Sequence, residues 1–386
     1  MTEDYENNRK KNGRIEYMLI VFGCLCVFGL AMFVGVTLFQ WISDLEDKET
    51  ITTSQSVQQS EDNISHISAE ELVDNQWKLP ESAKEEPVYT QAEVQVMIDK
   101  AREEAGVAAR EAMVAELEMQ LDNGSTIVEA MRKCFADRLV LASSGKYYFL
   151  PIRNDLAHNK YDKDKLVKTE DGELLYMEKD KVISHKGIDV SKFQGKIDWE
   201  KVAADGVEFA IIRIGYRGYG GTGKLVVDDT FRTNLEGAQK AGLKTGVYIY
   251  SQAINDEEIE QEVQLILEQL EGFELKGPVV FDVEKVTGAN GRMNDLTVEE
   301  RTRLTKLFCD KIKKAGYKPM IYHNMEMGLL MLDLTKLKSY DKWFAYYHDD
   351  FYYPYEYDIW QYTDKGTVDG IKGDVDINIA FKLWDE

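Results

Sequence analysis

The 386-residue sequence has only four cysteines and five histidines, and neither set is arranged as a metal site. Cys24 and Cys26 lie in an apolar N-terminal segment, and Cys134 and Cys309 are far from both, so the sequence contains no Cys-x-x-Cys pair and no disulfide framework. The histidines occur without the His-Glu-x-x-His pattern of zinc hydrolases. The sequence therefore predicts no metal and no other cofactor.

Basic residues are also scarce, since 47 Lys and Arg stand against 69 Asp and Glu and give a formal net charge of -22. A nucleic-acid-binding protein needs clustered Lys and Arg to neutralise phosphates, so no nucleic-acid partner is expected. An acidic surface is also repelled by anionic lipid headgroups. The hydrophobic content of 44%, with 11% aromatic residues, is enough for an enzyme-sized core.

One long apolar run, residues 17–43, contains no charged side chain. As a helix it would be about 40 Å long, enough to cross a bilayer core of about 30 Å. Four basic residues precede the run and acidic residues follow it, which places residues 1–16 in the cytoplasm and the rest outside the cell. A cleaved signal peptide is the alternative, but its apolar core is usually shorter and ends at a small-x-small site. We therefore expect a single-pass protein of the cell membrane.

Residues 44–90 are polar, with twelve acidic residues against three lysines. Such a segment cannot bury enough apolar surface to offset the entropy lost on ordering. It is predicted to be a disordered acidic tether.

Residues 91–140 are rich in strong helix formers, and small apolar residues recur in steps of four and three. These residues are Val94, Ile98, Ala101, Ala105, Ala108, Ala112, Ala115 and Met119. The spacing fits a coiled coil that would join copies of the chain through residues 91–121, and it fits equally well a single amphipathic helix docked elsewhere. Between residues 141 and 184, short apolar segments and an "EDGE" turn predict a small β module.

From residue 185 to 386 the pattern changes to strands alternating with helices. The expected strands are "KGIDVS", "EFAIIRIGY", "KTGVYIYS", "PVVFDVE", "KPMIYH", "KWFAYY", "YDIWQYT" and "DVDINIA". The expected helices are "DDTFRTNLEGAQKAG", "DEEIEQEVQLILEQLEG" and "TVEERTRLTKLFCDKIKKAG". No glycine-rich phosphate turn follows the first strand, so the pattern favours an α/β fold of the β/α (TIM-like) barrel type over a doubly wound sheet. The last three strands leave little room for helices, which predicts an irregular barrel.

Reactive groups in such barrels lie at the carboxyl ends of strands, where this sequence has acidic and aromatic residues. Asp282 and Glu284 occupy positions i and i+2 of one strand, so their side chains should share a face with Cα atoms about 6.5 to 7 Å apart. Neighbouring carboxylates repel, so one tends to keep a proton and can act as a general acid. A solvated strand edge is the alternative, but the preceding "PVVF" is too apolar for one. The pattern indicates cleavage of a glycosidic bond.

Several separated blocks, "GIDVS", "FAIIRIGY", "GVYIYS", "FDVE", "IYHN", "WFAYY" and "WQYT...VDIN", occur in the order found in one family. In these blocks the last 200 residues resemble glycoside hydrolase family 25, the Chalaropsis-type lysozymes. The resemblance implies cleavage of the β-1,4 bond between N-acetylmuramic acid and N-acetylglucosamine in peptidoglycan. It also implies that Glu284 is the catalytic acid/base and Asp282 its partner, with Asp189 and Asp376 completing the acidic site.

Two mechanisms fit this pair of carboxylates. Asp282 could attack the anomeric carbon as a nucleophile, but a retaining pair must flank the bond about 5 to 5.5 Å apart. Alternatively, Asp282 orients the acetamido group of the substrate, which attacks while Glu284 protonates the leaving oxygen; the sequence favours this route. The candidates for sugar contacts are Arg213, Tyr216, Tyr250, Tyr322, Tyr346, Trp360 and Gln361.

A second hypothesis keeps the barrel but not the reaction, as a glycan-binding or assembly protein of a cell-envelope or secretion apparatus. The presence of all four acidic residues favours the enzyme. No self-similar period marks a separate wall-binding repeat, so the expected partners are peptidoglycan strands and, through residues 17–43, the membrane.

Overall fold

The computed structural model describes residues 89–288, 290–348 and 350–384. The chain divides into two units, residues 1–95 and 96–386, of which the first is described only from residue 89. The expected membrane helix at 17–43 and all but the last two residues of the expected tether lie outside the described residues. None of the helices between residues 89 and 384 combines the length and apolarity needed to cross a bilayer.

Helix α2, Gln91–Asp122, has no buried residue along its 32 positions. Its first turn is closed by Glu93, which accepts hydrogen bonds from the backbone N–H and the hydroxyl of Thr90 at 2.8 Å. Val94 and Ile98 of the predicted seam are 41% and 40% exposed. A long helix without a buried face gains little from packing within its own chain, so self-association through α2 stays a prediction.

Helix α3, Ile127–Cys134, begins at a capping box formed by Thr126 and Glu129. The prediction that helix continues to residue 140 is wrong, because Arg138–Ser143 forms strand β1 and pairs antiparallel with β2, Lys146–Pro151. Four of the six residues of β1 are buried, including the apolar run Leu139, Val140 and Leu141. The turn of this hairpin has positive φ at Ser144 (50°) and Gly145 (73°), as two-residue hairpin turns require.

A second small sheet precedes the barrel, formed by β3, Leu166–Lys168, β4, Leu174–Glu178, and β5, Lys181–Val182. Its strands are antiparallel, and the β3–β4 turn contains the predicted "EDGE" segment. The two small sheets make up the β module expected between residues 141 and 184.

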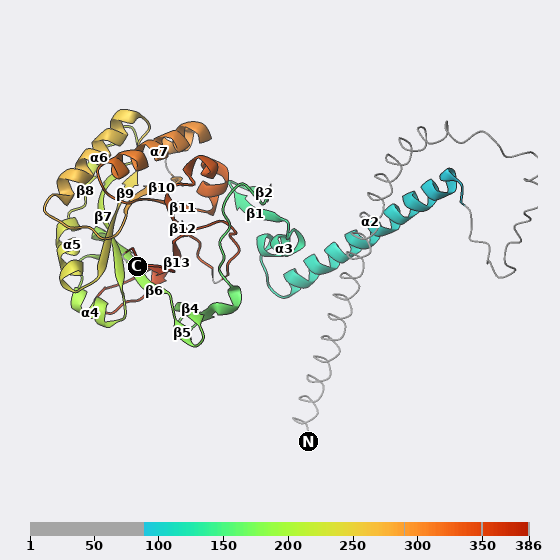
Figure 1. Cartoon of the computed structure of the whole chain (residues 1–386), viewed down its shortest axis with the longest axis horizontal. Helices are drawn as coiled ribbons and strands as arrows, with labels where there is room; N and C mark the ends of the chain where they lie inside the picture. Colours follow the sequence, from blue (N-terminus) through green and yellow to red (C-terminus); the bar gives the residue numbers. More distant parts are fainter. Residues whose placement is uncertain (1–88, 289, 349, 385–386) are drawn as a thin grey trace, which may run out of the picture. The chain divides into compact units, whose positions relative to one another are not determined.

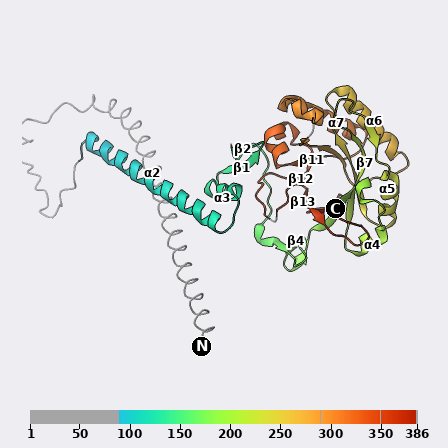
Figure 2. The ribbon, with the colours of Figure 1, turned by 180° about the vertical axis from the view of Figure 1, so that it is seen from behind.

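Eight strands close into a barrel (Figure 1 and, from behind, Figure 2). In chain order they are β6 His185–Val190, β7 Phe209–Arg217, β9 Lys244–Ser251, β10 Val279–Val283, β11 Pro319–Asn324, β12 Asp341–Ala345, β13 Ile359–Gly366 and β14 Val375–Ala380. The order around the barrel is β6-β14-β13-β12-β11-β10-β9-β7, closed by pairing of β7 with β6, and β8, Leu225–Val227, extends β7. All eight strands predicted from the sequence are confirmed.

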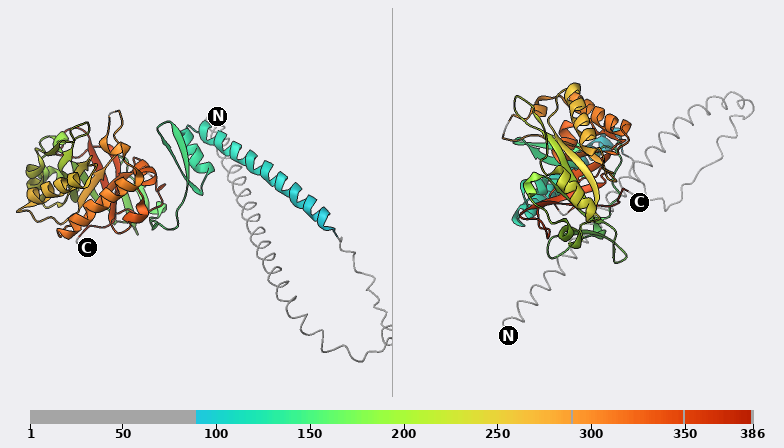
Figure 3. Two further views of the ribbon diagram at one scale, coloured as in Figure 1. Left: turned by 90° about the horizontal axis from the view of Figure 1, so that it is seen from above. Right: turned by 90° about the vertical axis from the view of Figure 1, so that its left-hand side faces the viewer.

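Strand β14 runs antiparallel to both of its neighbours, β13 and β6, whereas the other pairs of the ring are parallel. The helices of the barrel are also distributed unevenly, since the three longest pack on one part of its outer side (Figures 1 and 3). These are α5 Phe231–Lys240, α6 Asp256–Leu270 and α7 Val298–Lys314. A short helix, α4 Trp199–Ala204, follows β6. In the described part of the connections, which leaves out residue 349, no α-helix separates β12, β13 and β14, as their short length predicted. Single-turn helices are η1 Lys163–Lys165, η2 Lys192–Gln194, η3 Arg292–Asp295, η4 Met327–Met331 and η5 Leu334–Leu337.

The barrel has an inner core and an outer core, because successive side chains of a strand point to opposite faces. The inner core contains Phe209, Ile211, Val280, Met320 and Trp343, and the outer core fills the space between strands and helices. A glycine is required at position 187, since a Cβ there would lie 2.1 Å from Cζ of Phe209. The apolar inner core fills one end of the barrel, and polar residues take over toward the other.

Candidate active site

Strand β10 brings the predicted pair of carboxyl groups to one end of the barrel. Asp282 is the fourth residue of the strand and pairs with Tyr250 of β9 and Tyr322 of β11, while Glu284 follows the last strand residue. Paired residues of neighbouring strands share a face, so these three strands direct an acid and two phenols into the barrel mouth.

Asp282 is the more buried acid, with 5% of its surface exposed, whereas Glu284 is half-buried. Burial raises the pKa of Asp282 well above its usual range, and the charge of Glu284 and a hydrogen bond to it raise that pKa further. Burial also raises the pKa of Glu284, although the hydrogen bond from Asp282 opposes this. Burial, together with the charge of Glu284 beside Asp282, thus favours a protonated carboxyl group in this site, which is what a general acid requires.

Asp189, in β6, is held by amides from the last two strands. Its Oδ2 accepts hydrogen bonds of 2.8 Å from Nε2 of Gln361 and from Nδ2 of Asn378. Asn378 is fixed in turn, because its Oδ1 accepts a hydrogen bond of 2.7 Å from the indole of Trp343. Burial raises the pKa of Asp189, and the charge of Asp376 adds to the effect. This carboxyl group has a fixed orientation and no freedom to turn toward solvent.

Asp376 pairs directly with Asp189 across β14 and β6. Because β14 is antiparallel, this residue lies near the beginning of its strand and not at the carboxyl end, where the sequence placed it. The reversal nevertheless brings Asp376 to the same end of the barrel as the other three acids. Burial, with the charge of Asp364 next, raises the pKa of Asp376 to about 6.

Two tyrosine hydroxyl groups meet at Gln361. Oε1 of Gln361 accepts from Tyr322 at 2.8 Å and from Tyr347 at 3.0 Å, while its amide donates to Asp189. Tyr322 is 7% exposed and Tyr347 is 48% exposed, so one phenol lies below the mouth and the other borders solvent. The amide of Gln361 thus connects the buried acid to the rim of the site.

Arg213, in β7, is fixed by an ion pair with Asp228, whose Oδ2 lies 2.7 Å from its Nη2. Its guanidinium lies 5.3 Å from the ring centre of Tyr216 and 5.0 Å from that of Phe193, which is 77% exposed. A bulge after Arg213 shifts the register by one, so Tyr216 pairs with Tyr250 and comes to the same face as Arg213. The positive charge of Arg213 lowers the pKa of Asp282, against the effect of burial.

Two predicted sugar contacts, Tyr346 and Trp360, do not lie with the other candidates. Trp360 is 1% exposed in the outer core, and its indole donates a 2.7 Å hydrogen bond to the carbonyl of Tyr346. Tyr346 also belongs to the outer core, and its hydroxyl accepts from Arg132 of α3 at 2.8 Å. The prediction was wrong because strand residues alternate between faces: Gln361 faces the interior, so Trp360 cannot.

The structure adds residues to the site that the sequence analysis missed: Tyr347, Asn378, Trp343 and Phe193. The same alternation could have found most of them. Ala345 of β12 pairs with Gln361, whose side chain faces the interior of the barrel. The side chains two residues before and after Ala345, Trp343 and Tyr347, therefore face the interior as well. Phe193 follows β6 outside any strand, and nothing in the sequence marked it.

The β1–β2 hairpin also reaches this end of the barrel. Lys285, next to Glu284, donates a 2.9 Å hydrogen bond to the hydroxyl of Ser144 in the hairpin turn and forms an ion pair with Glu326. The residue after the proposed proton donor is therefore tied to a segment that precedes the barrel. Within residues 89–288, 290–348 and 350–384, no cluster of His, Cys, Asp or Glu has the arrangement of a metal site.

Comparison with known proteins identifies the family. The family model described as Glycosyl hydrolases family 25 matches residues 188–371, which include Asp189, Asp282 and Glu284. YegX of Escherichia coli (strain K12), an uncharacterized protein, is 30% identical over 202 residues, covering 50% of this chain and 68% of YegX. The autolytic lysozyme of Clostridium acetobutylicum is 28% identical over 199 residues, covering 50% of this chain and 55% of that protein.

Among solved structures, that of the modular autolysin LytC from Streptococcus pneumoniae in complex with a synthetic peptidoglycan ligand aligns with a TM-score of 0.46 and 21% identity. The alignment covers 63% of this chain and 66% of that one. Together, the match to the family model and the identity with YegX show that this chain belongs to glycosyl hydrolases family 25 and is a glycoside hydrolase.

Proposed function

We propose that the protein is a peptidoglycan hydrolase that cleaves the β-1,4 bond between N-acetylmuramic acid and N-acetylglucosamine. The observation that carries the proposal is the pair Asp282 and Glu284 at the end of β10, where burial raises the pKa of both carboxyl groups. The likeness to an autolytic lysozyme supports the choice of substrate. We further propose that the enzyme works outside a bacterial cell, held to the membrane by residues 17–43 and at high local concentration near the wall.

In this reaction Glu284 protonates the glycosidic oxygen. It is the more accessible of the two acids, and burial raises its pKa, which favours the protonated form that a general acid needs. Asp282 lies deeper and has an oxygen, Oδ1, without a hydrogen-bond partner among the described residues. That oxygen can accept a hydrogen bond from the N–H of a substrate acetamido group and direct its carbonyl toward the anomeric carbon.

This substrate-assisted route suits two acids that lie two residues apart at the end of one strand and approach the sugar from the same side. The alternative, attack by Asp282 itself, needs carboxyl groups that flank the bond. The two routes differ in what they leave on the protein. A slow substrate with a good leaving group traps a glycosyl ester on Asp282 only if Asp282 is the nucleophile, whereas removal of the substrate's N-acetyl group stops only the substrate-assisted route.

The test of the reaction uses the full-length chain in detergent with purified peptidoglycan. We expect new reducing ends that mass spectrometry identifies as N-acetylmuramic acid, and a loss of about 10²- to 10⁴-fold in kcat for Glu284→Gln. Glu299→Gln, an exposed acid in the first turn of α7, is the matched control and should retain activity. Binding of peptidoglycan without new reducing ends would instead favour the glycan-binding hypothesis.

The anchor and the self-association are tested separately. Deleting residues 1–44 should release the protein from membranes, and an undiminished membrane fraction would contradict the anchor. Replacing Ile98 and Ala105 of α2 by glutamate should lower the mass of the detergent-solubilised protein in analytical ultracentrifugation if α2 joins copies. An unchanged mass would remove the coiled coil from the proposal.

A further inference from the structure

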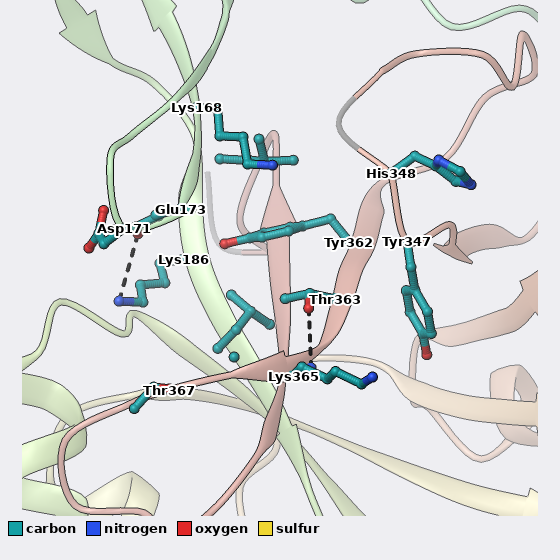
Figure 4. A pocket seen from close by; sticks show the side chains of 14 residues that line it. Lys168, Asp171, Glu173, Lys186, Tyr347, His348, Tyr362, Thr363, Lys365 and Thr367 are labelled. Atoms are coloured by element: carbon teal, nitrogen blue, oxygen red, sulfur yellow. Dashed lines mark hydrogen bonds and ion pairs between the residues drawn. The ribbon is translucent and has the colours of Figure 1, made fainter. Parts of the chain in front are cut away.

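Beside the acid site lies a cavity of about 680 Å³ (Figure 4). One wall comes from β3 and the β3–β4 turn, with Lys168, Asp171 and Glu173. The other comes from β13 and its surroundings, with Tyr362, Lys365 and Tyr347. The cavity therefore exists only where the small sheet meets the barrel.

The side chains around the cavity carry both signs of charge. Three lysines line it, Lys168, Lys186 and Lys365, together with the acids Asp171 and Glu173. Lys186 fixes one wall, since its Nζ lies 3.7 Å from Glu173 and 3.4 Å from Asp205. Lysines thus outnumber acids in this cavity, whereas acids outnumber basic residues in the chain as a whole.

Tyr347 joins this cavity to the acid site. It lines the cavity, and its hydroxyl donates to Gln361, which in turn donates to Asp189. A ligand in the cavity and a glycan in the acid site would therefore lie on two sides of one half-exposed phenol. A substrate with two chemically different parts could occupy both places at once.

The wall formed by the small sheet precedes residue 188, where the match to the family model begins. It is nevertheless firmly built. Tyr161, before β3, stacks on Phe381 with ring centres 3.7 Å apart, and its hydroxyl donates to the carbonyl of Tyr357 at 2.6 Å. The cavity is thus an addition of this chain to the matched part of the barrel, held in place by packing and hydrogen bonds.

We propose that this cavity binds the peptide branch of peptidoglycan while the glycan occupies the acid site. The inference rests on the proposed function and narrows its substrate class to peptide-bearing glycan. The sugars of a peptide-bearing glycan strand are neutral, because the lactyl carboxyl group is then part of an amide, so they offer no charge to the charged walls. A peptide branch carries carboxylates for Lys168 and Lys365, and amides and an amino group for Asp171 and Glu173.

The test compares two substrates with the full-length chain in detergent: peptidoglycan with its peptides, and the same material after an amidase has removed them. We expect kcat/KM to be at least 10-fold higher on the peptide-bearing substrate. The variant Lys168→Gln/Lys365→Gln should lower that ratio at least 5-fold through KM. Lys313→Gln/Lys314→Gln, which removes the same charge from the exposed end of α7, should keep the wild-type ratio. Equal ratios in wild type and the cavity variant would overturn the proposal.

A binding measurement separates this proposal from the proposed function. Full-length Glu284→Gln is titrated with the N-acetylglucosaminyl-N-acetylmuramic acid disaccharide, with and without its peptide, in a calorimeter. Tighter binding of the peptide-bearing form by at least 10-fold, weakened by added salt, supports the cavity even if wild type releases no reducing ends. Equal dissociation constants for the two disaccharides would refute the cavity's role even if hydrolysis is observed.

Discussion

Replacing Gln361 by methionine should destabilise the barrel strongly, although the two side chains have similar volumes. The change removes three hydrogen bonds, to Asp189, Tyr322 and Tyr347. The hydroxyl of Tyr347 can turn to water, since this residue is 48% exposed, but the other two partners are at most 7% exposed. An orphaned buried hydroxyl costs about 1 to 3 kcal/mol, and a lost hydrogen bond to a carboxylate about 1.5 to 3 kcal/mol, so we expect a loss of about 2.5 to 6 kcal/mol.

The assay is urea unfolding of the full-length chain followed by tryptophan fluorescence, with the loss taken as a shift of the midpoint at constant slope. Gln264→Met is the matched control: Gln264 is exposed on α6 and makes a single hydrogen bond of 2.8 Å to Glu268. That variant should stay within about 0.5 kcal/mol of wild type.

A double variant tests the role of the Gln361 hydrogen bonds even if the single variant is unstable for another reason. Adding Tyr322→Phe to Gln361→Met removes the orphaned hydroxyl, so the double variant should lose about 1 to 2 kcal/mol less than the sum of the two single losses. A loss below about 1 kcal/mol for Gln361→Met, or strictly additive losses, would show that these hydrogen bonds do not hold Asp189 in place.

Three further predictions concern stability. Burial raises the pKa of Asp376 to about 6, so between pH 3.8 and pH 6 the folded state keeps a proton that the unfolded chain has released. The free energy of unfolding should therefore fall by about 1 kcal/mol between pH 5 and pH 7.5, as the folded state loses this proton. A flat pH profile in urea unfolding would contradict this. Arg217→Met leaves Glu262, 2.7 Å from Arg217 and fully buried, without its partner, which should cost about 3 to 5 kcal/mol and be partly recovered by adding Glu262→Gln; no recovery would argue against the pair. Gly187→Ala places a methyl group 2.1 Å from Phe209, so thermal unfolding should show a loss of at least about 1 to 3 kcal/mol that Phe209→Leu partly relieves, and a neutral Gly187→Ala would contradict the packing.

The sequence predicted the barrel well because its strands are short apolar segments that end at turns and helix starts. Asp282 and Glu284 stood out for the same reason, since charge is rare inside such segments. Alternation along the strand then fixed their common face. The apolar pattern of a strand does not indicate whether the strand runs parallel or antiparallel to its neighbours. The segment "DVDINIA" therefore did not predict that β14 is antiparallel to β13 and β6. Direction is decided by the length and path of the connection, which only the fold shows.

The aromatic residues of the site were harder to predict, because tyrosine and tryptophan are common in both cores of the barrel. Choosing Trp360 together with Gln361 placed two neighbours of one strand on the same face, which the backbone does not allow. Tyr216 is the opposite case: it lies with Arg213 only because a bulge intervenes, and a bulge has no reliable signature in a single sequence. The cavity beside the acid site could not be predicted either, because its walls come from segments that meet only in the folded chain.

The reversed last strand has a consequence for the order of folding. Asp189 belongs to the first strand of the barrel and takes one of its two amide partners, Asn378, from the last, 189 residues further along the chain. Until β14 is synthesised and inserted between β13 and β6, the edges of those two strands stay unpaired and the acid lacks half of its hydrogen bonds. A growing or interrupted chain that lacks β14 thus carries the other seven strands of the barrel without a finished active site. The active site can therefore form only after β14 has paired with β13 and β6.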